Sequence, residues 1–397
     1  MKQFTPSRAI ARLPDQVFAT QANRIAAVRS EGHDVILLGQ GTPDQPTPPH
    51  ILDALKEAIS VSSNLQYPPF RGHDFLKEAV AAFYLREFGV EIDASTEVAI
   101  LLGSKAGIVA LPQTIVNPGE SVIVPDPGYP DYLSGAALAG AKAVPLPLLE
   151  ENAFLPDYSL LDPHDVANSR MLFLNYPSNP IGATATAEAF EATVAFADAN
   201  DICVVHDLAY GGITFDGPTR SFLETPGAKE TGIELFSLSK RFNMSGFRIA
   251  FAVGNASVIS AIETYQDHLY VSAFTPVQLA AEAALLSSQD CVTNLSDLYQ
   301  ARRDVLFAKL EEIGWDAPLS GGSFFVWLPV APGYTSQQFA DKLLHEAHVA
   351  VTPGHFFGEY GEGYVRLSLI ADASRLAEAI NRIKVLGLFT PADVIKF

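Results

Sequence analysis

The apolar run Ile233-Glu234-Leu235-Phe236 leads directly into the polar segment Ser237-Leu238-Ser239-Lys240-Arg241-Phe242-Asn243-Met244-Ser245-Gly246-Phe247-Arg248. The run is typical of a buried strand, and the segment after it carries reactive side chains. A lysine amine is one of the few groups that form a Schiff base with a carbonyl compound. Serine hydroxyls precede Lys240 and a guanidinium follows it, and such groups hold phosphates in proteins. This combination predicts pyridoxal phosphate (PLP) as a cofactor.

Further short apolar runs precede this strand, and helical patterns separate them. They are Val98–Leu102, Ser121–Val124, Arg170–Leu174 and Ile202–Val205. Near-continuous apolar strands separated by helices indicate an α/β fold, with a mainly parallel sheet covered on both faces.

The pattern changes after about residue 285, where longer helices surround an apolar strand at 323–328. A last amphipathic helix carries Leu376, Ile380, Ile383 and Leu386. We therefore predict a large cofactor-binding domain at 46–285 and a small α+β domain at 286–397. Residues 1–45 would form an N-terminal arm and part of the small domain.

Composition narrows the classes of partner. The chain has 397 residues, 48% of them hydrophobic, which is enough for two domains. Its formal net charge of −19 repels phosphate backbones and anionic lipids, so we expect neither nucleic acid nor a membrane as partner. No run approaches the ~20 apolar residues of a membrane span, and we see no signal peptide. The two cysteines, Cys203 and Cys291, suit a reducing compartment, and we expect a cytoplasmic location.

Polar residues follow the predicted strands at their carboxyl ends. Ligands of open α/β sheets bind just outside these ends, so we expect the side chains to meet in one cleft. Each residue alone has an ordinary explanation as a cap or turn residue, but together with Lys240 they favour a site. The residues are Ser104, Tyr129, Asn179, Asp207, Tyr210, Ser237 and Lys240.

The residue types suggest individual roles. Asp207 would keep a pyridinium nitrogen protonated, and the turn at 103–107 would offer backbone amides to a phosphate. Tyr129 would stack on a flat ring, and the amide of Asn179 would donate to a ring oxygen. Arg366, on a predicted strand at 363–368, would clamp a substrate carboxylate.

Two histidine motifs do not predict a site. His345-Glu346-Ala347-His348 lacks the spacing of a zinc helix and has no third ligand nearby, so we expect no metal. His206 precedes Asp207 on a strand and should point to the opposite face, which favours a core role.

From about Gly39 to the final helix, the chain resembles class I/II aminotransferases of PLP fold type I. The most specific motif is Ser237-x-Ser239-Lys240 with Gly246-x-Arg248 downstream. The other matching segments are Gly39-Gln40-Gly41-Thr42-Pro43-Asp44, Pro127-Gly128-Tyr129-Pro130, Asn179-Pro180-x-Gly182, Asp207-x-x-Tyr210, and Pro353-Gly354 leading to Arg366. The resemblance implies a large domain whose mainly parallel, seven-stranded sheet lies between helices, and a smaller α+β domain.

The resemblance also implies how the cofactor is held. Lys240 would bind PLP covalently, Asp207 would pair with the ring nitrogen, and Tyr210 with Asn179 would reach the ring hydroxyl. The phosphate would be held by Ser104, the backbone at Lys105, Ser237, Ser239 and Arg248. Many relatives have a small or neutral residue at Lys105, and the sequence leaves open whether its amine faces the phosphate or solvent.

The substrate and subunit contacts follow from the same resemblance. Arg366 would bind the substrate α-carboxylate, assisted by the Gly41 backbone and Asn179. Tyr67 would reach the cofactor phosphate of a neighbouring subunit, which implies a homodimer with shared active sites.

The chain is most similar to methionine-salvage aminotransferases, which aminate 4-methylthio-2-oxobutanoate in amino-acid biosynthesis. The predicted function is amino transfer between an L-amino acid and a 2-oxo acid. Aromatic residues that would line an apolar side-chain pocket are Phe18, Phe70, Tyr132, Phe356 and Phe357. The alternatives are a diaminopimelate, aspartate or aromatic aminotransferase, or a PLP-dependent carbon–sulfur β-lyase. A DNA-binding regulator with an aminotransferase-like domain is disfavoured by the acidic charge.

Overall fold

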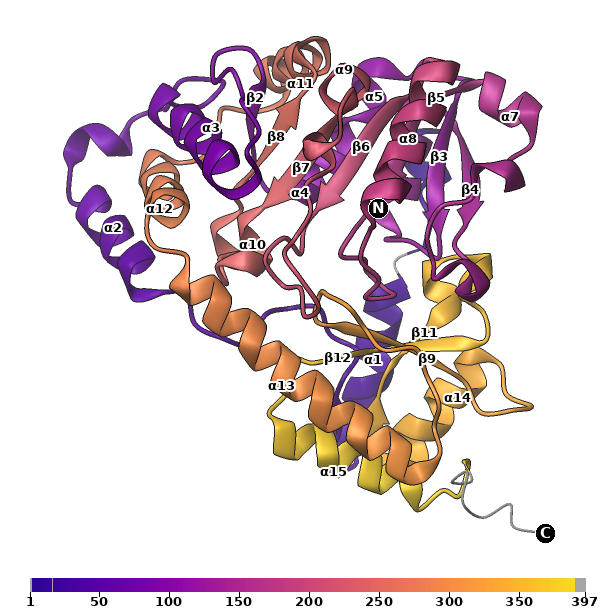
Figure 1. The fold of residues 1–397 in the computed structure, drawn as a ribbon. Coiled ribbons are helices and arrows are strands. Elements are labelled where there is room, and N and C mark those ends of the chain that lie inside the picture. Colours follow the sequence, from indigo (N-terminus) through magenta and orange to yellow (C-terminus); the bar gives the residue numbers. More distant parts are fainter. Residues whose placement is uncertain (1, 16, 390–397) are drawn as a thin grey trace.

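A seven-stranded sheet forms the centre of the computed structural model, which describes residues 2–15 and 17–389 (Figure 1). The strand order is β2-β8-β7-β6-β5-β3-β4. β8 runs antiparallel to both its neighbours and the other pairs are parallel. The predicted mainly parallel, seven-stranded sheet is therefore confirmed. The strands are β2 (Val98–Leu101), β3 (Ser121–Asp126), β4 (Lys142–Pro147), β5 (Ser169–Leu174), β6 (Cys203–Leu208), β7 (Gly232–Ser237) and β8 (Ala250–Gly254).

Two strands of this sheet were not predicted. β4 lies at an edge, alternates between buried and exposed residues, and contains Pro145 and Pro147, which weaken the strand pattern. β8 is a five-residue, fully buried run that contains two alanines and a glycine, residues with low strand propensity.

Helices cover both faces of the sheet because alternate residues of each strand point to opposite sides. One face packs against α3 (Asp74–Phe88), α8 (Ala187–Asn200) and α12 (Thr275–Leu286). The other face packs against α4 (Ser104–Ala110), α6 (Asp131–Ala139) and α11 (Ala256–Leu269). The remaining helices of this part are α2 (Pro49–Ile59), α5 (Pro112–Ile115), α7 (Pro163–Ala167), α9 (Ala228–Thr231) and α10 (Leu238–Arg241).

A second hydrophobic core surrounds a three-stranded antiparallel sheet of order β11-β12-β9. Its strands are β9 (Phe325–Pro329), β11 (Thr352–Pro353) and β12 (Tyr364–Ser368), and its helices include α14 (Ser336–Lys342) and α15 (Ala373–Lys384). The long helix α13 (Asp290–Ile313) runs from the large sheet into this part (Figure 1). Leu386 was predicted in the last helix but follows the end of α15, and residues 390–397 of the predicted small domain lie outside the described residues.

The N-terminal arm packs on this second part. β1 (Ile36–Leu37) pairs in parallel with β10 (Val349–Ala350). Helix α1 (Val17–Ser30) precedes β1 and crosses below the large sheet (Figure 1). The arm therefore brings residues from the start of the chain next to residues near its end.

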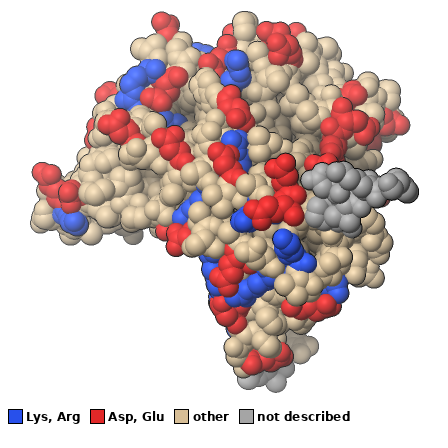
Figure 2. Space-filling model, turned by 60° about the horizontal axis from the view of Figure 1, so that its bottom comes forward, with Lys and Arg blue, Asp and Glu red and all other residues tan. Residues whose placement is uncertain are grey.

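Among the described residues, no helix has the length and apolar character needed to cross a bilayer. Figure 2 shows acidic and basic side chains mixed in small groups over one face of the molecule. The residues drawn there do not form a basic surface of the kind that binds nucleic acid phosphates.

Candidate active site

A cavity of about 690 Å³ lies at the carboxyl ends of the strands of the large sheet, between them, α1 and the small sheet. The predicted site residues, with the exception of Tyr67, line this cavity. They are Gly41, Ser104, Lys105, Tyr129, Asn179, Asp207, Tyr210, Ser237, Ser239, Lys240, Arg248 and Arg366. The fold therefore brings together side chains that are up to 325 positions apart, from residue 41 to residue 366.

Lys240 lies in the short helix α10, directly after β7. Ser237 caps this helix, because its hydroxyl accepts a hydrogen bond from the Ser239 N–H at 3.3 Å. Lys240 Nζ donates to the Gly41 carbonyl at 2.6 Å. Burial, with the nearby cations Arg366 and Arg248, lowers the lysine pKa from an ordinary 10.5 to about 8. A useful fraction of the amine is therefore neutral, and hence nucleophilic, near neutral pH.

Asp207 is the second-last residue of β6, and its two carboxylate oxygens have different surroundings. Oδ2 accepts from the Tyr132 hydroxyl at 2.9 Å, and the Asp207 carbonyl accepts from Asn175 Nδ2 at 2.6 Å. Oδ1 is buried without a hydrogen-bond partner among the described residues. Burial raises the pKa of this carboxyl to about 6. A protonated ring nitrogen would satisfy Oδ1, so the residue fits its predicted role.

Tyr132 has a different position from the predicted one. It does not line the cavity, but is buried, stacks on Phe173 at 4.8 Å between ring centroids, and orients the Asp207 carboxylate. The prediction that Tyr132 lines a substrate pocket is therefore wrong. Tyr132 lies in α6, and its ring packs edge-on against the ring of Tyr129.

The turn at Gly103 and the side chain of Arg248 form a candidate phosphate cradle. A Cβ atom on Gly103 would lie 2.3 Å from Arg248 Nη2, so only glycine lets the guanidinium lie across this turn. Ser104 is the first residue of α4, and the first N–H groups of a helix have no partner within it. Together with the Ser237 and Ser239 hydroxyls, these donors match the needs of a phosphate.

The structure shows the position of the Lys105 amine, which the sequence left open between the phosphate and solvent. Its amine forms an ion pair with Asp131 Oδ2 at 2.8 Å, and its side chain is half exposed. The charge of Lys105 is therefore partnered by Asp131, and its backbone N–H at the start of α4 is the group available to an anion.

Asn179 and Tyr210 also line the cavity. The Asn179 N–H donates to Asn175 Oδ1 at 2.7 Å, and Asn179 Oδ1 accepts from Arg366 Nη1 at 2.7 Å. The Tyr210 ring packs edge-on against Phe324 and Phe325. Asn175 was not predicted as a site residue, although it joins Asn179 to Asp207. Asn175 directly follows β5, and this position at the carboxyl end of a strand is the sequence signal that could have identified it as a site residue.

Arg366 is a buried cation on β12. It donates to Asn179 and, through Nη2, to the Gly39 carbonyl at 2.8 Å. Its Cζ lies 4.0 Å from the centroid of the Phe325 ring and 4.7 Å from that of Phe357. No carboxylate lies within ion-pair distance of it among the described residues, and its Nε has no partner there. A buried guanidinium without a counterion is suited to bind an anionic substrate group.

The predicted aromatic pocket is only partly present. Phe18 lines the cavity, and Phe357 packs behind Arg366. Phe70 is exposed, and Phe70, Phe356 and Phe357 do not line the cavity of the single chain, so the prediction is wrong for these three residues within one chain. Apolar residues that line the cavity include Phe18, Ile25, Leu37 and Phe325. Sequence patterns missed Ile25 and Leu37 because the arm reaches the cavity only through the pairing of β1 with β10.

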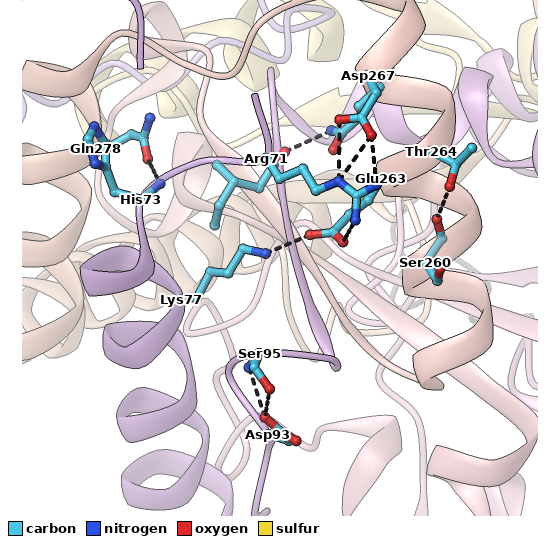
Figure 3. A network of polar contacts seen from close by, with 12 residues as sticks. Arg71, His73, Lys77, Asp93, Ser95, Ser260, Glu263, Thr264, Asp267 and Gln278 are labelled. Atoms are coloured by element: carbon cyan, nitrogen blue, oxygen red, sulfur yellow. Dashed lines mark hydrogen bonds and ion pairs between the residues drawn. The ribbon is translucent and has the colours of Figure 1, made fainter. Parts of the chain in front are cut away.

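Tyr67 lies outside the cavity and is 90% exposed. Its loop is held from one side by a polar network (Figure 3). Arg71 donates to Asp267 and Glu263 of α11 at 2.7 and 3.0 Å, and Lys77 donates to Glu263 at 2.6 Å. This network holds the base of the loop while leaving the tyrosine ring free.

The structure also shows the contacts of two histidines from the motifs, His206 and His348. His206 is fully buried, with Nδ1 2.7 Å from Glu234 Oε2, as a core role requires. His348 stacks on His33, with ring centroids 4.0 Å apart. Within the described ranges, no group of three or more His, Cys, Asp or Glu residues is arranged to hold a metal ion.

Comparisons with known proteins agree with this geometry. The model of the family "Aminotransferase class I and II" matches residues 33–383. The chain is 53% identical over 395 residues to the L-glutamine--4-(methylsulfanyl)-2-oxobutanoate aminotransferase of Bacillus subtilis, covering 99% of each chain. It is 43% identical over 382 residues to the LL-diaminopimelate aminotransferase of Desulforudis audaxviator, covering 96% of this chain and 97% of that one.

A solved structure of apo BacF from Bacillus subtilis superimposes with a TM-score of 0.94 and 46% identity, covering 98% of this chain and 99% of the other. The predicted fold and family are both confirmed. This chain is an enzyme that belongs to the class I and II aminotransferases.

Proposed function

We propose that this aminotransferase uses PLP to move an amino group between L-glutamine or L-methionine and 4-(methylsulfanyl)-2-oxobutanoate or another 2-oxo acid. The observation that carries the proposal is Arg366, a buried guanidinium without a carboxylate partner among the described residues, in the same cavity as Lys240. An α-carboxylate on Arg366 would bring the neighbouring α-carbon toward the lysine amine. The substrate assignment is supported by the named relative that is 53% identical.

The residues present fit PLP in two independent ways. Asp207 Oδ1 is a buried acceptor without a partner among the described residues, placed for a protonated ring nitrogen. At the other side, Gly103 leaves room that Arg248 fills, beside the start of α4. When bound, PLP supplies an electron-withdrawing ring that stabilises negative charge on the substrate α-carbon.

The chain's own residues supply the other steps. Lys240 would hold the cofactor covalently, and its amine, once released, would be placed to accept the substrate α-proton as general base and to donate a proton as general acid. A pKa of about 8 suits both the base and the acid role near neutral pH. Arg366 and Asn179 orient the substrate carboxylate, and Asp207 keeps the ring nitrogen positive.

A second candidate is a dicarboxylic substrate such as LL-diaminopimelate. Arg29 of α1 also lines the cavity, and the only hydrogen bond that its side chain makes among the described residues is a long one of 3.5 Å to the Val35 carbonyl. Its guanidinium is thus available for a second carboxylate. Relatives with 41–43% identity carry the LL-diaminopimelate name. A carbon–sulfur β-lyase would instead release pyruvate and ammonia from cystathionine without an oxo-acid acceptor.

We further propose a homodimer in which Tyr67 completes the partner's site. Tyr67 is almost fully exposed, and the exposed side chains of Leu65 and Phe70 lie close to it in sequence. A cluster of exposed apolar side chains of this kind is typical of a surface that another protein chain covers. The network around Arg71 holds this loop in place for a contact with a second copy.

A mixed dimer tests this arrangement. Lys240→Ala and Tyr67→Phe chains, each with its own tag, are co-expressed and the mixed dimer is isolated. If Tyr67 acts on the partner's site, one site per dimer contains both wild-type residues and PLP affinity and turnover return there. Activity per Lys240-containing site no higher than that of the Tyr67→Phe homodimer would contradict the proposal.

The predicted domain limits at residues 46 and 286, and a cytoplasmic location, remain proposals. They rest on the two separate hydrophobic cores and on the two free cysteines, Cys203 and Cys291.

A half-reaction screen tests the function. The PLP-loaded enzyme is mixed with single amino acids, and the loss of the cofactor absorbance is followed. Methionine and glutamine should react faster than alanine, and Lys240→Ala should react with none of them at a normal rate. Methionine reacting no faster than alanine would refute the substrate assignment while leaving the aminotransferase class intact.

A further inference from the structure

Gln21 is a buried polar side chain in the wall of the active-site cavity. It lies in α1 and is only 8% exposed. It lines the same cavity as Lys240 and Arg366. Its Nε2 donates to the Val351 carbonyl at 2.9 Å. Buried amide groups are normally paired at both ends, so the second end of this side chain requires an explanation.

The contact with Val351 sets the direction of the amide. A backbone carbonyl can only accept, so the NH₂ group must face Val351 and Oε1 must face the other way. Oε1 accepts no hydrogen bond from any described residue, and it is not one of the fully enclosed polar atoms. Gln21 therefore presents a single acceptor to the cavity, in an orientation that its neighbour fixes.

This acceptor lies near the expected position of a substrate side chain. Phe18, whose ring centroid is 5.8 Å from Arg366 Cζ, precedes Gln21 by about one helical turn, roughly 5 Å along α1. Val351 is next to Thr352, whose hydroxyl donates to the Gly39 carbonyl at 2.9 Å, the same carbonyl that accepts from Arg366. Gln21 is thus connected to Arg366, the residue proposed to bind the substrate carboxylate, both through Phe18 and through the segment Val351-Thr352.

We propose that Gln21 determines which amino donors are accepted, with Oε1 receiving a hydrogen bond from the ω-amide of L-glutamine. The inference rests on the proposed function and adds a residue that distinguishes among its substrates. The terminal carboxylate of glutamate has only acceptors and would face Oε1 unfavourably. The thioether of methionine needs no donor and would lie on the apolar side chains of Phe18, Ile25 and Leu37.

The test compares two amino acids in one enzyme. Single-turnover rates with L-glutamine and L-methionine are measured for the PLP-loaded wild type and for Gln21→Met, which has a similar length but no acceptor oxygen. The ratio of the glutamine to the methionine second-order rate constant for this half-reaction should fall about three- to ten-fold, as expected for one neutral hydrogen bond. Asn23→Met, an equal change at an exposed residue outside the cavity lining, should leave the ratio unchanged.

A second variant distinguishes the acceptor role from a structural one. Gln21→Glu keeps the shape and adds negative charge, so it should favour an amino acid whose distal end is an ammonium without a carboxylate, such as L-lysine, over glutamine. A glutamine-to-methionine ratio equal to that of the wild type in Gln21→Met, including equal losses for both amino acids, would overturn the inference and leave the proposed function standing. Wild-type enzyme that converts neither amino acid would overturn both proposals.

Discussion

The pKa of Lys240 leads to a prediction that can be measured directly. Burial is the largest cause of its low value, followed by the charges of Arg366 and Arg248. With a pKa of about 8, about 9% of the amine is neutral at pH 7. A lysine with an ordinary pKa of 10.5 would be only about 0.03% neutral, so Lys240 should hold about 300-fold more reactive amine.

Competitive acylation measures this difference. Cofactor-free protein is mixed with a trace of acetic anhydride from pH 6 to pH 11, and a free lysine analogue in the same tube serves as the standard. Mass spectrometry of the digest then gives the labelling of Lys240, normalised to its plateau. The curve should rise through a midpoint near pH 8, because only the neutral amine reacts.

The causes of the shift can be tested separately. Arg366→Met removes one nearby cation but leaves the site buried, so the midpoint should move upward only part of the way toward 10.5. A wild-type midpoint at pH 10 or above would refute the reasoning, because it would mean that water solvates Lys240 as it does an ordinary surface lysine. A full return to 10.5 in the Arg366→Met variant would show that charge, rather than burial, dominates.

Three further substitutions test the rest of the site. Gly103→Ala should weaken PLP binding at least tenfold in a fluorescence titration with normal circular dichroism, because the new methyl group displaces the Arg248 guanidinium; unchanged affinity would contradict the phosphate cradle. Asp207→Asn should retain PLP but lose most turnover, since a neutral amide does not hold the ring nitrogen positive; wild-type kcat would contradict that role. Arg366→Lys should lower kcat/KM for amino acids about 10- to 100-fold through loss of the bidentate contact, and an effect below twofold would place the carboxylate elsewhere.

The fold and most of the site followed from local patterns. Apolar runs located five strands of the large sheet within a few residues, because buried parallel strands need continuous apolar sequence. The polar residues after those runs, such as Asp207 and Lys240, indeed line one cavity. β4 and β8 were missed because an edge strand with prolines and a short alanine-containing strand lack that pattern.

Other features depended on contacts between distant segments. Tyr132 looked like a pocket aromatic, yet its hydroxyl binds Asp207, 75 positions away in the chain. Gln21 belongs to no motif that the sequence analysis used, and the orientation of its amide is set by a hydrogen bond to the Val351 carbonyl, 330 positions away. Sequence patterns therefore sufficed for the family and for five strands of the large sheet, and they pointed to Lys240 as the reactive residue, because these features are encoded in short segments. Within residues 2–15 and 17–389, the Gln21 acceptor, one Asp207 oxygen and the Arg366 charge lack partners. These features arise only from packing, because hydrogen-bond satisfaction depends on neighbours that the chain order does not reveal.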